Sequence, residues 1–342
     1  MTTQKSKEIR LKSRPAGMPA LENFELVEVN VPDPGPGQIL VRNSYMTVDP
    51  YMRGRMVDRK SYVPPFQIGE ALSGGAVGQV VRAGAGAPFK AGDHVMSMAG
   101  WREWFVSDGA GMQKIDPLPG IGIQTYLGAL GMPGLTAYAG LLRVGALKEK
   151  ERVFVSAASG AVGAVVCQIA KAKGCYVVGS AGSDEKCAYL REIGCDKAIN
   201  YKTSSDLNAA VASAFPDGID VYFENVGGAH LEAAIDAMRQ FGRIAACGMI
   251  EQYNATTMPP GPRNIIMVVG LSLTMRGFIV VDHFDMLPDF MRDMAMWAKE
   301  GKMKWRETIA DGIENAPQAF IGLFKGENFG KMLVRVGPDK AV

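Results

Sequence analysis

The chain contains a glycine-rich turn of the kind that can hold a diphosphate. Residues 153–163 read Val-Phe-Val-Ser-Ala-Ala-Ser-Gly-Ala-Val-Gly and pass from apolar residues into small ones. Gly160 would let the backbone approach a pyrophosphate, and Gly163 would let a following helix pack closely on the strand. The N–H groups at the start of that helix would face the anion. The A-x-x-G-x-x-G spacing therefore predicts dinucleotide binding through Gly160, Ala161, Val162 and Gly163.

The end of the next apolar run favours NADP(H) over NAD(H). Enzymes that prefer NAD place an acidic residue there, against the ribose 2′-hydroxyl, whereas residues 178–183 of this chain contain no carboxylate. With Lys186 and Tyr201 within reach, this segment suits a 2′-phosphate. Asp184 and Glu185 are the counter-argument, and we interpret them as acids at the positive end of a helix.

The first third of the chain lacks the side chains for a catalytic zinc site. It has no cysteine, and His94 is its only histidine, so two cysteine or histidine ligands for a catalytic zinc cannot be assembled there. His230 and His283 are expected on helix or loop surfaces. Without a metal to polarise an alcohol, hydride transfer to a conjugated double bond is the simpler chemistry, because it needs mainly orientation and a donor for the enolate. A tyrosine phenol could be that donor.

Two different sequence patterns along the chain predict two domains of an α/β protein. Before about residue 125, short β-rich runs such as 38–42 and 78–81 alternate with glycine- and proline-rich turns, which indicates an irregular antiparallel barrel. After it, strand-length apolar runs alternate with helical periods, as in a parallel sheet of β-α-β units. The expected strands are 152–157, 176–179, 197–200, 220–224 and 243–247. Val162, Val165, Val166, Ile169 and Ala170 predict one stripe of an amphipathic helix.

The end of the chain is expected to return to the first domain. Runs 306–309 and 331–336 read as two further strands. We therefore assign residues 1–125 to the first part of a catalytic domain, 126–303 to a cofactor-binding domain, and 304–342 to the returning part of the catalytic domain.

Composition excludes several other classes. The 342 residues are 47% hydrophobic and carry a net charge of +2, which gives no electrostatic footprint for nucleic acid. Five cysteines without a C-x-x-C pair indicate no disulfide framework. The longest apolar stretch, Ile265–Met275, is well short of the roughly 20 residues that span a bilayer. The basic start lacks the apolar segment of a secretory signal and is interpreted as a solvated edge. We expect a soluble, cytoplasmic protein with small apolar partners.

Four segments carry a more specific likeness. Val48–Met56, Leu130–Tyr138, Glu224–Gly228 and Asn328–Lys331 resemble the signatures of the zinc-independent leukotriene B4 dehydrogenase/prostaglandin reductase family within the medium-chain dehydrogenase/reductase superfamily. This family includes plant alkenal double-bond reductases and bacterial curcumin reductases, and the chain is most similar to the latter branch through 14–15, 254–256 and 314–318. The resemblance implies a GroES-like, mainly antiparallel β-barrel, a doubly wound Rossmann domain, NADPH, and commonly a homodimer joined through the cofactor-domain sheets.

The resemblance also implies residue roles. Lys186 and Tyr201 would hold the 2′-phosphate. Further cofactor contacts would come from Ser180, Asn225, Cys247, Gly248, Tyr253, Phe278, Ile279, Val280 and Asn328. Tyr253 is the leading catalytic or substrate-orienting candidate, and Tyr62 and Tyr51 are weaker ones. For Tyr62, a role as an aromatic wall of the site is as good an explanation as a catalytic role. For Tyr51, packing of the motif loop is the better explanation. The cofactor's ribose 2′-hydroxyl could itself donate to the enolate in place of a tyrosine.

These observations predict an oxidoreductase that uses NADPH to reduce the C=C bond of 2-alkenals and 2-alkenones, with hydride added to the β-carbon. A quinone reductase is the alternative within the same class, since quinones are also conjugated acceptors. A non-catalytic NADPH-binding protein of the crystallin type is the alternative from another class.

Overall fold

The parallel sheet expected in the middle of the chain is present in the computed structural model, which describes residues 3–339. Its strands are β8 (Arg152–Val155), β9 (Tyr176–Ala181), β10 (Lys197–Asn200), β11 (Ile219–Glu224), β12 (Met238–Ala246) and β13 (Thr274–Gly277). They lie in the order β10-β9-β8-β11-β12-β13, and every neighbouring pair is parallel. This is the order of a doubly wound dinucleotide-binding sheet, whose switch point lies between β8 and β11.

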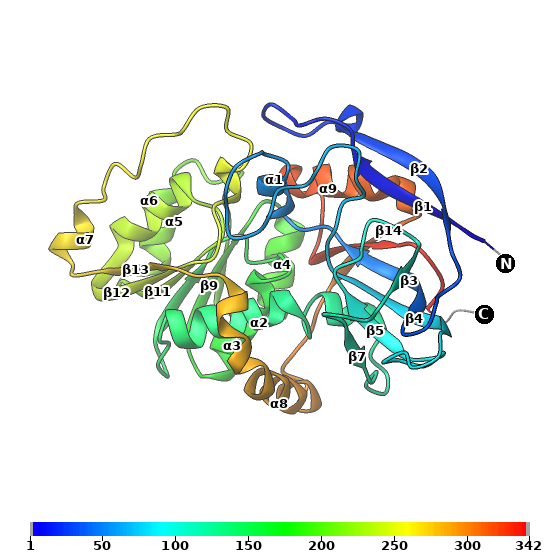
Figure 1. Ribbon diagram of the computed structural model, residues 1–342. Coiled ribbons are helices and arrows are strands. Elements are labelled where there is room, and N and C mark those ends of the chain that lie inside the picture. Colours follow the sequence, from blue (N-terminus) through cyan, green and yellow to red (C-terminus); the bar gives the residue numbers. More distant parts are fainter. Residues whose placement is uncertain (1–2, 340–342) are drawn as a thin grey trace. The chain divides into compact units, whose positions relative to one another are not determined.

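Helices cover both faces of this sheet. Figure 1 shows α5 and α6 on one side and α2 and α3 on the other. The helices of this unit are α2 (Met132–Ala139), a π-helix (Gly140–Val144), α3 (Gly163–Ala172), α4 (Asp184–Glu192), α5 (Leu207–Ala214), α6 (Gly228–Ala237), η4 (Ile250–Gln252), α7 (Met267–Gly270), η5 (Val280–Met286) and α8 (Leu287–Lys299). The unit comprises Gly128–Arg306 and Phe329–Lys331.

Several sequence expectations need correction. The first strand ends at Val155 rather than residue 157, because Ala157 adopts a left-handed backbone (φ 46°) and belongs to the turn. β12 begins at Met238 rather than residue 243, and its extra residues include Phe241 with φ 64° opposite a register shift in β11. Residues 163–170 of α3 are all buried instead of showing one apolar stripe, because α2 packs on the helix as well as the sheet.

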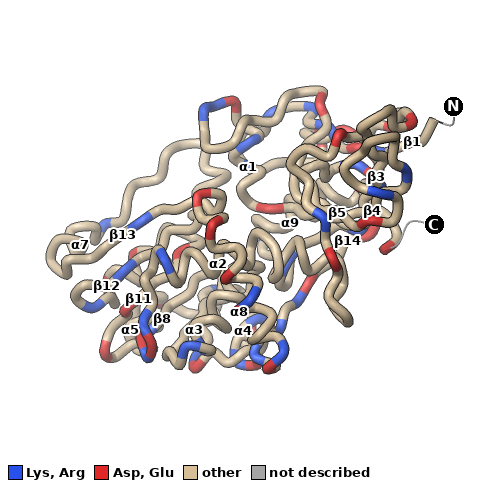
Figure 2. The backbone as a smooth tube through the Cα atoms, turned by 60° about the horizontal axis from the view of Figure 1, so that its bottom comes forward, with Lys and Arg blue, Asp and Glu red and all other residues tan. Residues whose placement is uncertain are grey.

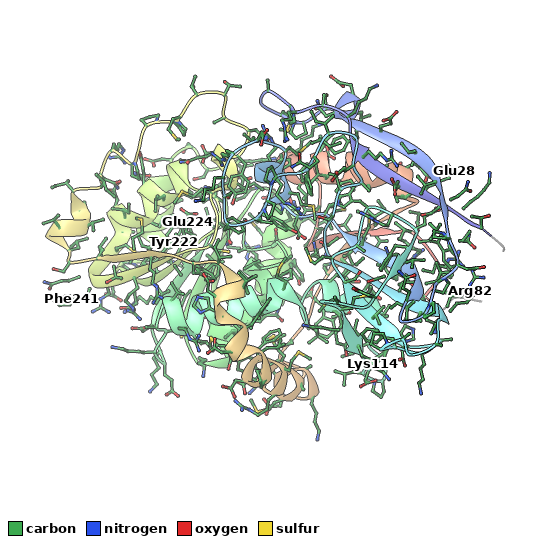
Figure 3. All side chains as sticks on the ribbon, in the orientation of Figure 1. Glu28, Arg82, Lys114, Tyr222, Glu224 and Phe241 are labelled. Carbon is green, nitrogen blue, oxygen red and sulfur yellow. The ribbon has the colours of Figure 1, made fainter. Side chains whose placement is uncertain are left out.

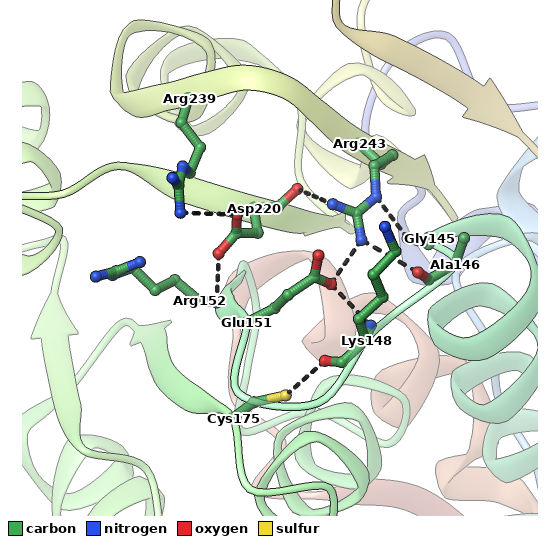
Figure 4. Close-up of polar contacts among 9 residues, drawn as sticks. All are labelled: Gly145, Ala146, Lys148, Glu151, Arg152, Cys175, Asp220, Arg239 and Arg243. Carbon is green, nitrogen blue, oxygen red and sulfur yellow. Dashed lines mark hydrogen bonds and ion pairs between the residues drawn. The ribbon is translucent and has the colours of Figure 1, made fainter.

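The amino ends of three neighbouring strands are joined by a polar network (Figure 4). Arg243 on β12 makes an ion pair of 2.6 Å with Glu151, the residue before β8. Asp220 on β11 accepts hydrogen bonds from the backbone N–H of Arg152 (2.8 Å) and from Arg239 (3.3 Å). The network ties β8, β11 and β12 together at the amino ends of the strands. Ligands of such sheets bind at the opposite, carboxyl ends of the strands.

The second unit is the antiparallel one. It comprises the chain up to Leu127, Glu307–Asn328 and the chain from Met332 onward. Its strands follow the order β14-β15-β3-β4-β5-β7, with β6 also on β3, and the pairings of β3 with β4, β6 and β15 are antiparallel. The bounds are β3 (Ile39–Thr47), β4 (Ala76–Ala83), β5 (His94–Ser97), β6 (Trp104–Ser107), β7 (Gln113–Ile115), β14 (Glu307–Asp311) and β15 (Lys331–Arg335). The predicted GroES-like, mainly antiparallel architecture is confirmed. The strands expected at 306–309 and 331–336 are found at Glu307–Asp311 and Lys331–Arg335.

A separate two-stranded sheet and short helices complete this unit. β1 (Gln4–Leu11) pairs antiparallel with β2 (Phe24–Val31), and the helices are η1 (Leu21–Asn23), α1 (Met52–Arg55), η2 (Ile123–Leu127), η6 (Ile313–Asn315) and α9 (Ala316–Lys325). Lys5 and Lys7 are exposed on β1, and Lys5 makes an ion pair with Glu28. In the core, Trp101 stacks on Phe24 and meets the edge of Phe320.

Charge and hydropathy agree with the composition. Lys and Arg alternate with Asp and Glu along the backbone of both units (Figure 2). The apolar stretch Ile265–Met275 is divided between α7 and β13. Across residues 3–339, the helices are too short or too polar to cross a membrane.

Candidate active site

The glycine turn after β8 has the close packing that its spacing predicts. A Cβ on Gly163 would lie 2.5 Å from the carbonyl oxygen of Ala157 and 2.7 Å from the Cα of Ala158, so α3 can start this near the strand only without a side chain there. Gly160 donates its N–H to Ala157 at 3.0 Å, and a Cβ on it would lie 3.2 Å from the same oxygen. The turn is therefore compact and backbone-lined, as pyrophosphate binding requires.

The returning segment braces this turn, which sequence reasoning did not foresee. Gly330 donates its N–H to the carbonyl of Ser159 at 3.0 Å, and Gly160 and Gly330 form an isolated β-bridge outside the named strands. Gly330 has φ 69°, and a Cβ on it would overlap the Arg306 carbonyl. Asn328, a predicted cofactor contact, directly precedes this segment and is half-buried. Ala161 and Val162, also half-buried, follow Gly160 in the turn.

The carboxyl end of β9 gathers positive charge and a phenol. A Cβ on Gly182 would lie 2.9 Å from the hydroxyl of Tyr201 and 3.2 Å from Cε of Lys202. Burial, and secondly the ammonium of Lys202, lowers the pKa of Lys186, so the two lysines lie near each other. Two like charges beside a hydroxyl donor suit a phosphate. The sequence named Lys186 and Tyr201 but missed Lys202, although it is adjacent to Tyr201 in the chain.

Of the two acidic residues near this corner, Asp184 bonds away from it, whereas the charge of Glu185 acts on Lys186. Asp184 and Glu185 lie in the first turn of α4, as interpreted from the sequence. Asp184 accepts a hydrogen bond of 2.7 Å from Asn200, and the Ser183 hydroxyl caps the helix by accepting from the N–H of Lys186 at 3.2 Å. Ser180 lies inside β9 and is fully buried, with no partner for its hydroxyl within residues 3–339.

Tyr201 packs against a buried histidine. Its ring meets that of His230 on α6 edge to face, at 4.9 Å between centroids. His230 is only 4% exposed, and burial lowers its pKa to about 4, so the imidazole is neutral at pH 7. The surface positions expected for His230 and His283 were wrong. Both are buried, because the inner side of α6 packs on the sheet and His283 packs against Phe278.

A buried carboxylate organises the carboxyl ends of the central strands. Glu224, the last residue of β11, accepts four hydrogen bonds at Oε1: from Ser156 Oγ (3.1 Å), Tyr222 OH (2.8 Å), and the N–H groups of Val226 (2.6 Å) and Gly227 (2.9 Å). Figure 3 shows Tyr222 and Glu224 close together. The side chain is fully buried, and burial raises the pKa of Glu224. A glutamate ending the apolar run 219–224 was the sequence signal for it.

Three predicted cofactor residues lie at the same carboxyl ends of the central strands. Asn225 donates from its backbone to Ser156 Oγ (2.9 Å) and from its side chain to the Ser156 carbonyl (2.7 Å). Cys247 and Gly248 donate their N–H groups to the carbonyl of Glu224 at 3.0 and 3.1 Å. The turns after β8, β11 and β12 are therefore locked to one another.

A hollow of about 390 Å³ opens beside these turns. Its lining is mainly apolar and includes four predicted residues; it consists of Ala246, Cys247, Gly248, Met249, Gly277, Phe278, Ile279 and Asp282. Val280 is next in the chain and is buried. Burial, with the Glu224 carboxylate, raises the pKa of Cys247 to about 12, so its thiol is protonated at neutral pH and contributes an apolar wall.

Tyr253 lies next to Gly248, one of the residues that line this hollow. It follows η4, and a Cβ on Gly248 would lie 2.9 Å from its hydroxyl. The phenol therefore lies directly over a glycine of the lining, where it could donate a hydrogen bond to a molecule in the hollow.

The other two candidate tyrosines lie in the antiparallel unit. Tyr51 precedes α1 and packs on the hydrophobic core. Burial, then the Asp49 carboxylate, raises the pKa of its hydroxyl. Tyr62 is 60% exposed. Both phenols lie within electrostatic range of the Arg55 guanidinium, which covers the ring of Phe66 at 4.0 Å. Sequence reasoning missed Arg55.

Within residues 3–339, no three His, Cys, Asp or Glu side chains are grouped closely enough to hold a metal ion.

Fold and site together define a two-domain, dinucleotide-dependent oxidoreductase, and comparison with known proteins gives the family. Residues 7–115 match a model described as N-terminal domain of oxidoreductase, and residues 161–296 match one described as zinc-binding dehydrogenase. The chain is 45% identical over 342 residues, 98% of each chain, to NADPH-dependent curcumin reductase of Escherichia coli. It is 43% identical over 343 residues, 98% of each chain, to the NADP(+)-dependent 2-alkenal reductase of Nicotiana tabacum.

A solved structure agrees over nearly the whole length. CurA from Vibrio vulnificus, in complex with NADPH, matches with a TM-score of 0.91 at 42% identity, covering 96% of this chain and 99% of that one. The chain belongs to the medium-chain dehydrogenase/reductase superfamily and, within it, to the curcumin, alkenal and prostaglandin reductase family that its four signature segments predicted.

Proposed function

We propose that this protein is an oxidoreductase that reduces the C=C bond of α,β-unsaturated aldehydes and ketones with NADPH. The observation that carries this proposal is the identity of 45% and 43%, over 98% of the chain, to a curcumin reductase and a 2-alkenal reductase. NADPH supplies a hydride to the β-carbon, and a proton added at the α-carbon completes the saturated product. NADP⁺ is the second product, so charge and electrons balance.

The glycine turn and the basic corner would hold the cofactor's phosphates. Residues 160–163 provide a compact backbone surface for the pyrophosphate. Lys186, Tyr201 and Lys202 converge at the end of β9, where an enzyme specific for NAD carries an acid. A dianionic 2′-phosphate bound between the two ammonium groups would offset their mutual repulsion. We therefore expect a strong preference for NADPH over NADH.

The hollow would hold the reacting groups. Cys247, Gly248, Phe278 and Ile279 belong to its mainly apolar lining. Tyr253 donates a hydrogen bond to the substrate carbonyl oxygen, on which negative charge grows during reduction. The cofactor's ribose 2′-hydroxyl is the alternative donor. Candidate contacts that rest on the family resemblance are Ser180, Asn225, Val280, Asn328, Tyr51 and Tyr62.

Parallel assays test the function. NADPH consumption is measured with a 2-alkenal, a 2-alkenone and a quinone, with the saturated product identified in each case. We expect the enal and enone to turn over faster than the quinone. Faster turnover of the quinone would make the protein a quinone reductase, and tight NADPH binding without turnover of any acceptor would make it a non-catalytic binding protein.

The reaction is proposed to need no metal. We expect full enal reduction by protein whose metal content is negligible by elemental analysis and after treatment with a chelator. Loss of activity on chelation, restored by zinc, would contradict this.

Assembly and location are further proposals. A homodimer through the parallel sheets is supported by β13, which is one of the two edge strands of its sheet, and by exposed apolar side chains near it, including Phe241, Ile266 and Val269. Light scattering should give twice the chain mass. We propose the cytoplasm as the location, which cell fractionation tests. Limited proteolysis near residues 125 and 303 tests the proposed division into 1–125, 126–303 and 304–342.

A further inference from the structure

Three alternate residues of the segment after β12 each lie against a glycine. Met249 faces Gly227, where an added Cβ would come within 3.1 Å of the Met249 Cβ. Glu251 faces Gly228, where an added Cβ would overlap its carboxylate. Tyr253 faces Gly248, as described above. Every second side chain of the segment therefore packs on a glycine.

Backbone bonds also hold this segment. Ile250 donates its N–H to the carbonyl of Asn225 at 3.2 Å, and Glu251 donates to that of Val226 at 3.1 Å. η4 then carries the chain to Tyr253, whose N–H bonds to Ile250 at 3.2 Å. The turn that receives these bonds is itself held by Glu224, so the segment rests on a rigid base.

The carboxylate of Glu251 occupies the amino end of α6. This helix spans ten residues, and its N-cap, Gly227, has no side chain to cap it. A negative group at this end is stabilised by the helix dipole. Both glycines have positive φ, 87° for Gly227 and 48° for Gly228, and the absence of a Cβ on Gly228 leaves room for the carboxylate. Glu251 itself is exposed, so its truncation leaves no cavity.

We propose that Glu251 is the positioning residue for Tyr253. It pins η4 against the start of α6, and the phenol two residues on is thereby held over Gly248 at the hollow. This inference rests on the proposed function and on the role of Tyr253 in it. Glu251 acts through Tyr253 and does not touch the reacting atoms.

A second effect of the same carboxylate distinguishes this role from general support of the fold. Its charge reaches Tyr201, whose pKa is raised by burial and then by Glu251. Since Tyr201 belongs to the corner proposed for the 2′-phosphate, the negative charge of Glu251 opposes the negative ligand there. Removing it should therefore slow the reaction without weakening NADPH binding, whereas local collapse of the site would impair both.

The test is a double-mutant cycle with kcat, KM and the NADPH dissociation constant as readouts. Glu251→Ala should lower kcat for a 2-alkenal by roughly tenfold, because small misplacements of a positioned group cost one to two orders of magnitude. The NADPH dissociation constant should stay equal or fall. Glu251→Gln, which keeps the shape, should lie between Ala and wild type. In the Tyr253→Phe background, Glu251→Ala should change kcat by less than about twofold.

Glu149→Ala removes another exposed glutamate, in the turn before β8, and should match wild type. An equal loss of kcat from Glu251→Ala in both backgrounds would overturn the inference, as would a rise in the NADPH dissociation constant or an unchanged kcat in Glu251→Ala or Tyr253→Phe. With each of these outcomes the wild-type protein is still an active reductase, so the proposed function stands while this inference fails. A wild type inactive with every conjugated acceptor would instead refute the proposed function, and this inference with it.

Discussion

Replacing Gly163 with alanine adds one methyl group where α3 crosses the end of β8. The new Cβ would lie 2.5 Å from the Ala157 carbonyl oxygen, whereas ordinary contact begins at 3.4 Å. The start of α3 would have to retreat by the difference, about 0.9 Å. Overpacking of this kind costs about 1–3 kcal/mol, and the better helix propensity of alanine offsets at most about 1 kcal/mol. We expect a net loss of about 1–2 kcal/mol in the free energy of unfolding.

Gly160→Ala is the matched control in the same turn. Its Cβ would lie 3.2 Å from the same oxygen, so a shift of about 0.2 Å relieves the contact, and we expect the free energy of unfolding to change by less than about 0.5 kcal/mol. The methyl group would instead project where the pyrophosphate must approach. The NADPH dissociation constant should therefore rise about tenfold or more.

Urea unfolding without cofactor and NADPH fluorescence titration measure the two quantities. The reasoning requires that Gly163→Ala lose stability and that Gly160→Ala lose affinity while keeping stability. An unfolding midpoint for Gly163→Ala equal to wild type would show that the close packing of helix on strand is not a constraint. Unchanged NADPH affinity in Gly160→Ala would show that the diphosphate does not lie on this turn.

Three further predictions concern single side chains. Tyr253→Phe should lower kcat for a 2-alkenal about tenfold or more at saturating substrate; an unchanged kcat would favour the ribose hydroxyl as donor. Lys202→Ala should raise the dissociation constant for NADPH about tenfold but barely that for NADH, and an equal effect on both would place the 2′-phosphate elsewhere; Lys186→Ala should behave alike. Burial raises the pKa of Glu224 above 4.5, so its protonated form is favoured by folding, and its contribution to stability is present at low pH and lost as pH rises through the raised value. The unfolding free energy of wild type relative to Glu224→Gln should therefore fall as the pH rises above 4.5, the ordinary pKa of a glutamate, and a difference independent of pH would contradict the assignment.

Local patterns in the sequence predicted much of the cofactor unit. The strand 197–200 is found at the predicted bounds, and Gly163 packs as its place in the motif requires. Both depend on interactions between residues close in the chain, which a spacing rule can capture. The start of β12 could not be predicted in the same way, because residues 238–242 are joined to the expected strand through the pairing of Met238 with Ile219 on β11, across a register shift.

The residues of the candidate site also divide into those that local motifs identify and those that depend on long-range contacts. Motifs identified seven residues that the structure brings to the carboxyl ends of the strands of one sheet. They are Lys186, Tyr201, Cys247, Gly248, Phe278, Ile279 and Tyr253. Lys202, Glu224 and Glu251 were missed. Each matters through partners that are remote in sequence or that a motif does not mark, such as the Ser156 hydroxyl for Glu224 and the α6 amino end for Glu251.

By itself the sequence determined the superfamily, the alternation of strands and helices, and the glycine turn, since these are written in short-range spacing and composition. Only the tertiary structure decided which side chains meet. Parallel strands that are neighbours in the sheet are separated by long crossovers in the chain, and β8 lies beside β11 rather than β10. The meeting of Ser156 with Glu224, 68 residues away, therefore follows from strand order, which no local pattern encodes.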